Sequence, residues 1–209
     1  MTEPSGAAAP YKIGLTGNIA TGKSTVGKML RALGAAVIDA DKVAHRVMAP
    51  GGRAYAAVVD AFGPEIVAGG GEIDRQALGQ IVFSDPDALR QLESLVHPAV
   101  IAEVDQWMAS SEAPVVVVEA IKLLESGMAE TYGAIWVTTC SETTQLERLM
   151  ASRGMSRDEA LVRIHAQPPQ AEKLAHADVV IDTEGTFAAT RRQVAGAWRR
   201  IDPGPAASR

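Results

Sequence analysis

The chain has 209 residues and a formal net charge of −5 at pH 7, which suits one domain with a sizeable core. Hydrophobic residues make up 47% of it and aromatic residues only 4%, so we predict a core built mostly of Ala, Val, Leu and Ile. The net negative charge of the chain does not indicate binding to nucleic acid or to an anionic membrane, and neither is expected as a partner.

The chain shows no targeting or membrane signal. Its first ten residues lack a basic segment followed by an apolar one, and no stretch reaches the ~18 consecutive apolar residues of a spanning helix. We therefore expect a cytoplasmic protein. The single cysteine, Cys140, excludes an intrachain disulfide and is read as an apolar filler after a strand. Residues 1–10 and 202–209 are predicted to be flexible tails, and no oligomeric state is predicted.

The first predicted element is a strand at residues 11–15, and it leads into a phosphate-binding motif. Residues 17–24 match the P-loop pattern G-x-x-x-x-G-K-[ST], and an amphipathic stretch at 24–33 follows. Strand, loop and helix in this order point backbone N–H groups and a helix N-terminus at the same phosphate oxygens. The predicted contacts to a nucleoside triphosphate are Gly17, Asn18, Ile19, Ala20, Thr21, Gly22, Lys23, Ser24 and Thr25.

Each residue type in the motif has a physical role. Gly17 and Gly22 permit the turn and the close approach of backbone to phosphate. Lys23 can reach the β- and γ-phosphates, and the Ser24 hydroxyl can ligate Mg²⁺. Thr25 is either a further contact or a backbone cap in the first helical turn.

Apolar, β-branched runs alternate with helical patterns along the chain, at 13–16, 36–39, 115–119, 134–138 and 179–182. This alternation predicts an α/β fold, a parallel sheet with helices on both faces and ligands beyond the carboxyl ends of its strands.

The second strand ends in two carboxylates, Asp39 and Asp41. A carboxylate at this rim could accept the proton of an attacking hydroxyl or hold a metal-bound water. Alternatively, either aspartate could cap the helix that begins near residue 42, and one could cap while the other catalyses.

Between the second and third strands, residues 42–113 read as several helices. Asp74 is a predicted helix cap, and Pro86 and Pro98 stand at predicted first helical positions. The insertion is longer than a crossover needs. It is either a subdomain that binds substrate or an elaborated crossover that serves stability.

Further features narrow the class of P-loop protein. No Asn-Lys-x-Asp segment for reading guanine is present, and the third strand ends in Glu119 rather than in the Asp usual in motor and transporter ATPases. Small-molecule phosphoryl transfer is therefore the favoured class. Arg148 and Arg153 either lie on a lid that closes over phosphate or face solvent on a helix.

With these residues in view, the chain resembles the dephospho-coenzyme A kinases from about residue 11 to residue 201. Besides the P-loop, the resemblance rests on Ile13-Gly14-Leu15-Thr16-Gly17, Ile38-Asp39-Ala40-Asp41, Val96-His97-Pro98, Leu123-Leu124-Glu125-Ser126, Arg163-Ile164-His165-Ala166-Gln167 and Ala177-Asp178-Val179-Val180-Ile181-Asp182.

The resemblance implies transfer of the ATP γ-phosphate to the ribose 3′-hydroxyl of dephospho-coenzyme A, giving coenzyme A and ADP. It also implies a P-loop NTPase fold with a five-stranded parallel sheet in one kinase domain, residues 11–201. Within that domain we expect a core at 11–41 and 114–201, a helical acceptor-binding insertion at 42–113 and a lid at 142–165. The alternatives are another P-loop nucleoside or nucleotide kinase, and a nucleotide-gated interaction protein.

By position, the resemblance makes Asp41 the general base and gives Asp39 a supporting role for the base or the metal. It has Lys23 steady the β- and γ-phosphates and Arg148 and Arg153 act from the lid, while the 179–182 strand and the residues after it border the adenine.

The chain departs from the family in two places. Asn18 and Ala20 stand where the usual loop has glycine, and residues 120–124 lack the family's proline before the paired leucines. Lys122 in that second segment either touches an acceptor phosphate or faces solvent. His97, before Pro98, is read as structural.

Overall fold

A computed structural model describes residues 9–201 of the chain. These residues form two compact units, which we call the sheet unit (9–38 and 111–201) and the helical unit (39–110). The two predicted tails lie almost entirely outside the described residues. Within 9–201, no helix combines the length and the apolar character needed to span a bilayer.

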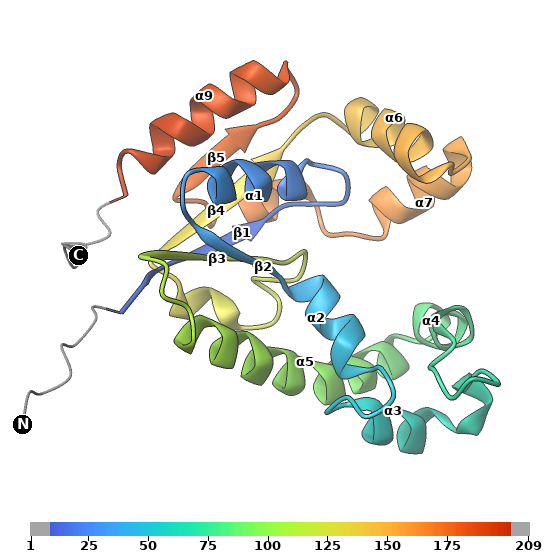
Figure 1. The fold of residues 1–209 in the computed structure, drawn as a ribbon. Helices are drawn as coiled ribbons and strands as arrows, with labels where there is room; N and C mark the ends of the chain where they lie inside the picture. Colours follow the sequence, from blue (N-terminus) through green and yellow to red (C-terminus); the bar gives the residue numbers. More distant parts are fainter. Residues whose placement is uncertain (1–8, 202–209) are drawn as a thin grey trace, which may run out of the picture. The chain divides into compact units, whose positions relative to one another are not determined.

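The sheet unit is built on five parallel strands, as predicted (Figure 1). They are β1 (Tyr11–Thr16), β2 (Ala36–Asp39), β3 (Val115–Glu119), β4 (Ala134–Thr139) and β5 (Val179–Asp182). Their order is β2-β3-β1-β4-β5. Strand β1 is central, with Ile13 opposite Val117 on one side and Ala134 on the other. The residues that follow β1 therefore emerge in the middle of the sheet edge where α/β proteins bind ligands.

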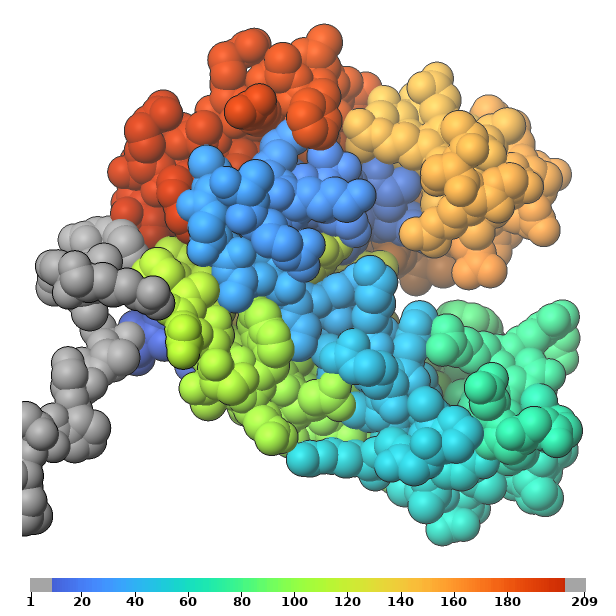
Figure 2. Space-filling view, viewed as in Figure 1, coloured from blue at the N-terminus to red at the C-terminus, as the bar shows by residue number. Residues whose placement is uncertain are grey.

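The helices of the sheet unit are α1 (Lys23–Ala32), α6 (Glu142–Arg153), α7 (Arg157–His165), α8 (Gln170–Leu174) and α9 (Phe187–Trp198), with a short 3₁₀ turn, η2 (Met128–Thr131). Helices α1 and α9 pack together, and Figure 2 shows them side by side on the surface. Beneath them, Leu15 and Trp136 of the sheet meet Leu30 of α1 and Val194 of α9 in one buried cluster. This packing holds α1, and so the end of the loop that precedes it.

The helical unit contains α2 (Ala40–Val47), α3 (Tyr55–Phe62), η1 (Pro64–Ile66), α4 (Arg75–Ser84) and α5 (Pro86–Ala109). Asp74 caps α4 as predicted, because its carboxylate accepts the backbone N–H groups of Gln76 and Ala77. Pro86 is the first residue of α5, also as predicted.

The expectation that Pro98 begins a helix is wrong. Pro98 lies inside α5, a helix of 24 residues. A proline there removes one backbone hydrogen bond and typically costs about 3 kcal/mol. The exposed side of α5 carries Pro98, whereas Val96, Val100 and Val104 are buried, so the packed face of the helix continues past the proline.

Candidate active site

The predicted phosphate loop joins β1 to α1, and glycine is required at both of its ends. Gly17 has a φ of 148° and Gly22 a φ of 88°. A Cβ on Gly17 would lie 2.6 Å from the carbonyl oxygen of Thr138, so no side chain fits there. Gly22 is the N-cap of α1, which has no acidic residue in its first turn. No carboxylate in that turn competes with an anion at the helix N-terminus.

Between these glycines, Ala20 is the one non-glycine residue of the described chain with a positive φ, 58°. The sequence departs from the family's glycines at both Asn18 and Ala20, but only Ala20 takes the left-handed conformation. Asn18 instead donates from its side-chain amide to the carbonyl of Pro168, at 3.0 Å. The backbone strain in the loop is therefore concentrated at Ala20.

Lys23 lies over the loop, and the residue is only 7% exposed. Its Nζ donates to the carbonyl oxygens of Gly17 at 2.8 Å and Asn18 at 3.2 Å. The ammonium group is thus held at the loop itself, where a bound phosphate could replace carbonyl oxygens as its acceptor.

Ser24 donates from its hydroxyl to Oε1 of Glu119, at 2.7 Å. Glu119 ends β3, the neighbour of β1, and is 7% exposed. A Cβ at Gly27 would lie 3.2 Å from the other Glu119 oxygen, so this glycine leaves room for the carboxylate. In the sequence, Glu119 argues only against one class of ATPase, and its contact with Ser24 is not predicted. The signal for that contact is an acidic residue at the end of the strand that follows the insertion.

The chemistry of Ser24 and Glu119 fits Mg²⁺, which prefers hard oxygen ligands and usually binds through one or two carboxylates plus substrate phosphates. Residues 9–201 contain no group of three or more His, Cys, Asp or Glu side chains that could hold a metal alone.

Three buried threonines hold the loop against the ends of β4 and β5. Thr21 Oγ1 lies 2.7 Å from Thr138 Oγ1 and donates to the carbonyl of Asn18 at 2.8 Å. Thr183 donates to the carbonyl of Thr21, at 2.9 Å. The loop is therefore braced by neighbouring strand ends as well as by its own glycines.

A pocket of about 430 Å³ brings the loop and both predicted arginines together. It is lined by Ala20, Gly22, Lys23, Ser24, Thr25, Arg148, Ala151, Ser152 and Arg153. Arg148 donates to the carbonyl oxygens of Ala20 at 3.1 Å and Thr183 at 2.6 Å. Arg153 ends α6 and is exposed. The pocket thus combines three cationic side chains with the loop.

A smaller pocket of about 220 Å³ lies beside the first and also includes Gly22, Thr25 and Arg148. Its other walls come from Thr183, Gly185, Phe187 and Thr190, after β5. Phe187 is 65% exposed and presents a free aromatic surface.

Burial raises the pKa of the Cys140 thiol, which keeps the thiol protonated. This agrees with the prediction that Cys140 is an apolar filler.

Asp39 and Asp41 belong to the helical unit, whereas the loop and the arginines belong to the sheet unit. Asp39 caps α2: its carboxylate accepts the backbone N–H of Lys42 at 3.1 Å and lies 3.2 Å from the Lys42 ammonium. Asp41 lies in the first turn of α2. Asp39 therefore has the capping contact expected of one aspartate, and the role of Asp41 at the loop stays a prediction.

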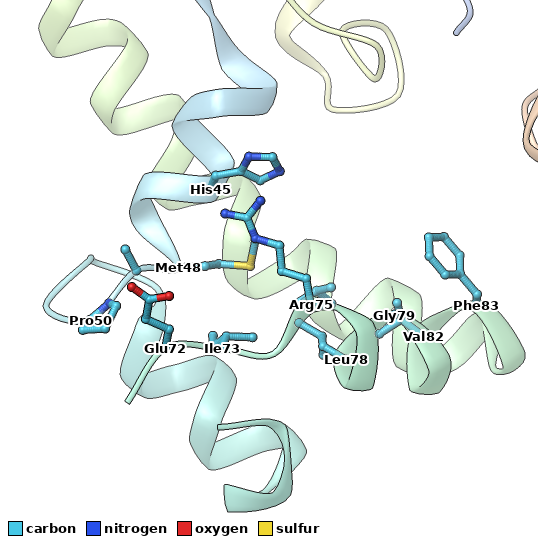
Figure 3. A pocket seen from close by; sticks show the side chains of 12 residues that line it. His45, Met48, Pro50, Glu72, Ile73, Arg75, Leu78, Gly79, Val82 and Phe83 are labelled. Atoms are coloured by element: carbon cyan, nitrogen blue, oxygen red, sulfur yellow. The ribbon is translucent and has the colours of Figure 1, made fainter. Parts of the chain in front are cut away.

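The helical unit has a pocket of its own, of about 300 Å³ (Figure 3). Its walls are mostly apolar, and its lining residues are His45, Met48, Ala49, Pro50, Glu72, Ile73, Arg75, Leu78, Gly79, Val82, Phe83 and Leu92. Burial, and then the charge of Arg75, lower the pKa of His45. The pocket therefore combines an apolar lining with a cation near a neutral imidazole.

The fold and the site together define a class. A glycine loop leads from the central strand of a parallel sheet into a helix N-terminus, and a hydroxyl–carboxylate pair and two arginines stand beside it. This is the arrangement of a P-loop kinase.

A sequence model of the dephospho-CoA kinase family matches residues 11–189, and the chain belongs to that family. The dephospho-CoA kinase of Symbiobacterium thermophilum is 48% identical over 191 residues, which are 90% of this chain and 80% of the relative. That of Geobacter metallireducens is 46% identical over 197 residues, or 92% and 98% of the two chains. The solved dephospho-CoA kinase from Campylobacter jejuni superposes with a TM-score of 0.65 at 28% identity, covering 91% of this chain and 96% of that one.

Membership confirms the predicted family and the prediction of an ATP-dependent phosphotransferase that acts on an alcohol. It also disfavours both alternatives, the other P-loop nucleoside or nucleotide kinases and the nucleotide-gated interaction protein.

The strain at Ala20 makes the first testable prediction. A non-glycine residue in the left-handed region destabilises the folded state by about 1–2 kcal/mol, and glycine relieves this strain. Glycine also gives the unfolded chain more conformational freedom, which offsets about 0.4–1 kcal/mol of the gain. We expect Ala20→Gly to raise the free energy of unfolding by about 0.5–1 kcal/mol, measured by urea denaturation. The matched variant Asn18→Gly should lower it, because it removes the hydrogen bond to Pro168. A loss of stability in Ala20→Gly would contradict the strain.

Proposed function

We propose that this chain performs its family's reaction, the transfer of the ATP γ-phosphate to the 3′-hydroxyl of dephospho-CoA, with the loop at residues 17–24 as the donor site. The observation that carries the proposal is the pocket in which this loop, Arg148 and Arg153 meet. Family membership supplies the acceptor.

In this proposal the loop N–H groups and the N-terminus of α1 bind the β- and γ-phosphates. Lys23 exchanges its contacts with Gly17 and Asn18 for phosphate oxygens, which neutralises charge that the transfer leaves on ADP. The adenine occupies the smaller pocket beside Phe187 and Thr183, where an aromatic side chain and polar groups are available.

Mg²⁺ fits beside Ser24. Ser24 would ligate it, and Glu119 would orient the Ser24 hydroxyl. When bound, Mg²⁺ neutralises charge on the β- and γ-phosphate oxygens.

Asp41 is the proposed general base. It would take the proton of the 3′-hydroxyl as that oxygen attacks the γ-phosphorus and the bond to the β–γ bridging oxygen breaks, releasing ADP. Its place just after β2 supports the proposal, because the carboxyl ends of parallel strands share one edge of a sheet. Asp39 would support the base by fixing the first turn of α2.

The helical unit is the proposed acceptor-binding insertion, and α6 and α7 are the proposed lid. The pocket of the helical unit has apolar walls and Arg75, which suits an acceptor with a long uncharged arm attached to a diphosphate. Arg148 and Arg153 would bring positive charge to the transferring phosphoryl group from α6. We place the reaction in the cytoplasm, where ATP is abundant, with no nucleic acid or membrane as a partner.

An acceptor-panel assay tests the function. The protein with ATP and Mg²⁺ should convert dephospho-CoA into CoA and ADP, detected by chromatography, and should leave nucleosides, nucleotides and shikimate largely unchanged. Turnover of one of those acceptors without turnover of dephospho-CoA would contradict the proposal.

The role of Asp41 generates a separate prediction. Asp41→Asn removes the proton acceptor and keeps the size of the side chain, so the single-turnover rate should fall by about 10² or more while the ATP dissociation constant stays nearly unchanged. Asp60→Asn, on the exposed surface of α3 in the same unit, is the matched control. An unchanged single-turnover rate in Asp41→Asn would remove the role of base from this residue.

A further inference from the structure

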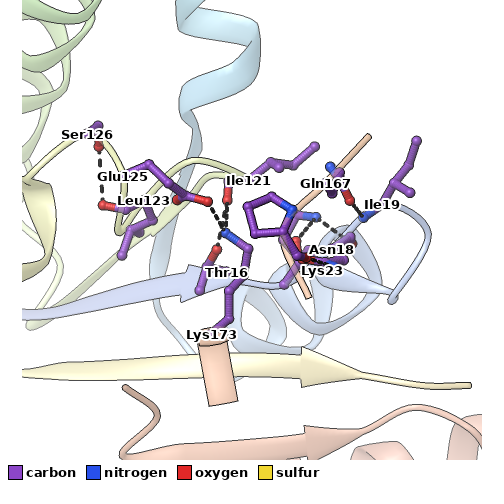
Figure 4. Close-up of polar contacts among 12 residues, drawn as sticks. Thr16, Asn18, Ile19, Lys23, Ile121, Leu123, Glu125, Ser126, Gln167 and Lys173 are labelled. Atoms are coloured by element: carbon purple, nitrogen blue, oxygen red, sulfur yellow. Dashed lines mark hydrogen bonds and ion pairs between the residues drawn. The ribbon is translucent and has the colours of Figure 1, made fainter. Parts of the chain in front are cut away.

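The segment between α7 and α8 contacts the phosphate loop directly (Figure 4). The side chain of Gln167 accepts the backbone N–H of Ile19 at 2.6 Å. The next residue, Pro168, accepts the side-chain amide of Asn18 at 3.0 Å. Two adjacent residues of one segment therefore hold two adjacent residues of the loop, about 150 positions away in the chain.

Ile19 is held from other directions as well. Its carbonyl accepts the side-chain amide of Gln145 of α6, at 2.7 Å. Its side chain is 8% exposed and packs in a buried cluster with Leu149 of α6 and Ile164 of α7. Both backbone polar groups and the side chain of Ile19 are thus held by α6, by α7 and by Gln167, two residues after the end of α7.

The Asn18 side chain is committed in the same way. Its amide nitrogen is held by Pro168, and its Oδ1 is buried with no hydrogen-bond partner among residues 9–201. Leaving a buried oxygen unpaired is unfavourable, so the oxygen does not hold the side chain in this position. The hydrogen bond from the amide nitrogen to Pro168 does. Ala20, the strained residue, comes two positions later. The conformation of the loop therefore depends on groups outside it.

The other end of the same segment is anchored too. Lys173 of α8 is 2% exposed, and its Nζ donates to the carbonyl of Ile121 at 2.7 Å and to Oε1 of Glu125 at 2.7 Å. Thr16, at the end of β1, donates to the same Ile121 carbonyl at 3.2 Å (Figure 4). Residues 167–173, which we call the strap, are thus fastened to the loop at one end and to the residues after β3 at the other.

We propose that Gln167 is a positioning residue that sets the backbone of the phosphate loop for ATP, acting through Ile19. It does not touch the nucleotide. Its oxygen accepts the Ile19 N–H and so fixes the Asn18–Ile19 peptide plane, one peptide before the plane that precedes Ala20, while Lys173 keeps the strap in place. Because α7 ends just before Gln167, the same contact links the proposed lid to the phosphate site. The inference rests on the proposed function only in that ATP is the ligand of the loop.

The test compares Gln167→Met, which keeps length but removes the acceptor, with Gln167→Glu, which keeps an acceptor oxygen. Gln193→Met is the matched control, because the Gln193 side chain also accepts a backbone N–H, that of Asp182, but makes no contact with the loop. ATP affinity is measured by isothermal titration calorimetry without acceptor, and thermal unfolding reports stability.

We expect the ATP dissociation constant to rise about tenfold in Gln167→Met, which corresponds to about 1.4 kcal/mol. It should stay within about threefold of the native value in Gln167→Glu and unchanged in Gln193→Met. In steady-state assays the KM for ATP should rise in Gln167→Met while the KM for dephospho-CoA does not.

A Gln167→Met protein that binds ATP like the native protein, whether or not its melting temperature falls, would reduce Gln167 to a structural residue and overturn the inference. If the native protein itself binds no ATP, the proposed function fails instead. The two failures are therefore distinguishable.

Discussion

The close approach of the phosphate loop to β4 is the constraint on which the rest of the site depends. Gly17 lies so near Thr138 that a side chain would collide with it, and hydrogen bonds of Thr21 and Thr183 fasten the loop to the ends of β4 and β5. The loop can hold this position only because β1 lies between β3 and β4. The backbone N–H groups of the loop can face a phosphate only if three features hold together. These are the order of the strands, the packing of α1 and the conformation of the loop.

Around this loop the chain gathers groups whose charges suit phosphoryl transfer. Lys23, Arg148 and Arg153 bring positive charge to one pocket, and Ser24 with Glu119 provides the oxygen atoms that a hard cation prefers. The proposed base stands in the other compact unit, just after the chain leaves β2. The proposed donor site and the proposed acceptor site thus belong to different parts of the chain.

The strands and the phosphate loop could be predicted because their signals are local: apolar runs of strand length, and four fixed positions in eight residues. Glu119 and Gln167 could not, because their loop partners lie 95 and 148 positions away and only the fold brings them together. Pro98 was misplaced because a local rule about proline ignored the buried valines that continue α5. Both departures from glycine were visible in the sequence, but which of the two takes the left-handed conformation was not, and the structure places it at Ala20, while Asn18 bonds to Pro168.

A crystal structure of the protein with a non-hydrolysable ATP analogue and Mg²⁺ would test the role of the phosphate loop most directly. We expect the triphosphate to lie along residues 17–24, Lys23 Nζ to exchange the Gly17 carbonyl for phosphate oxygens, and Ser24 to ligate the metal. A triphosphate bound elsewhere, or a Lys23 that keeps both carbonyl contacts while the nucleotide is present, would show that the loop is not the donor site.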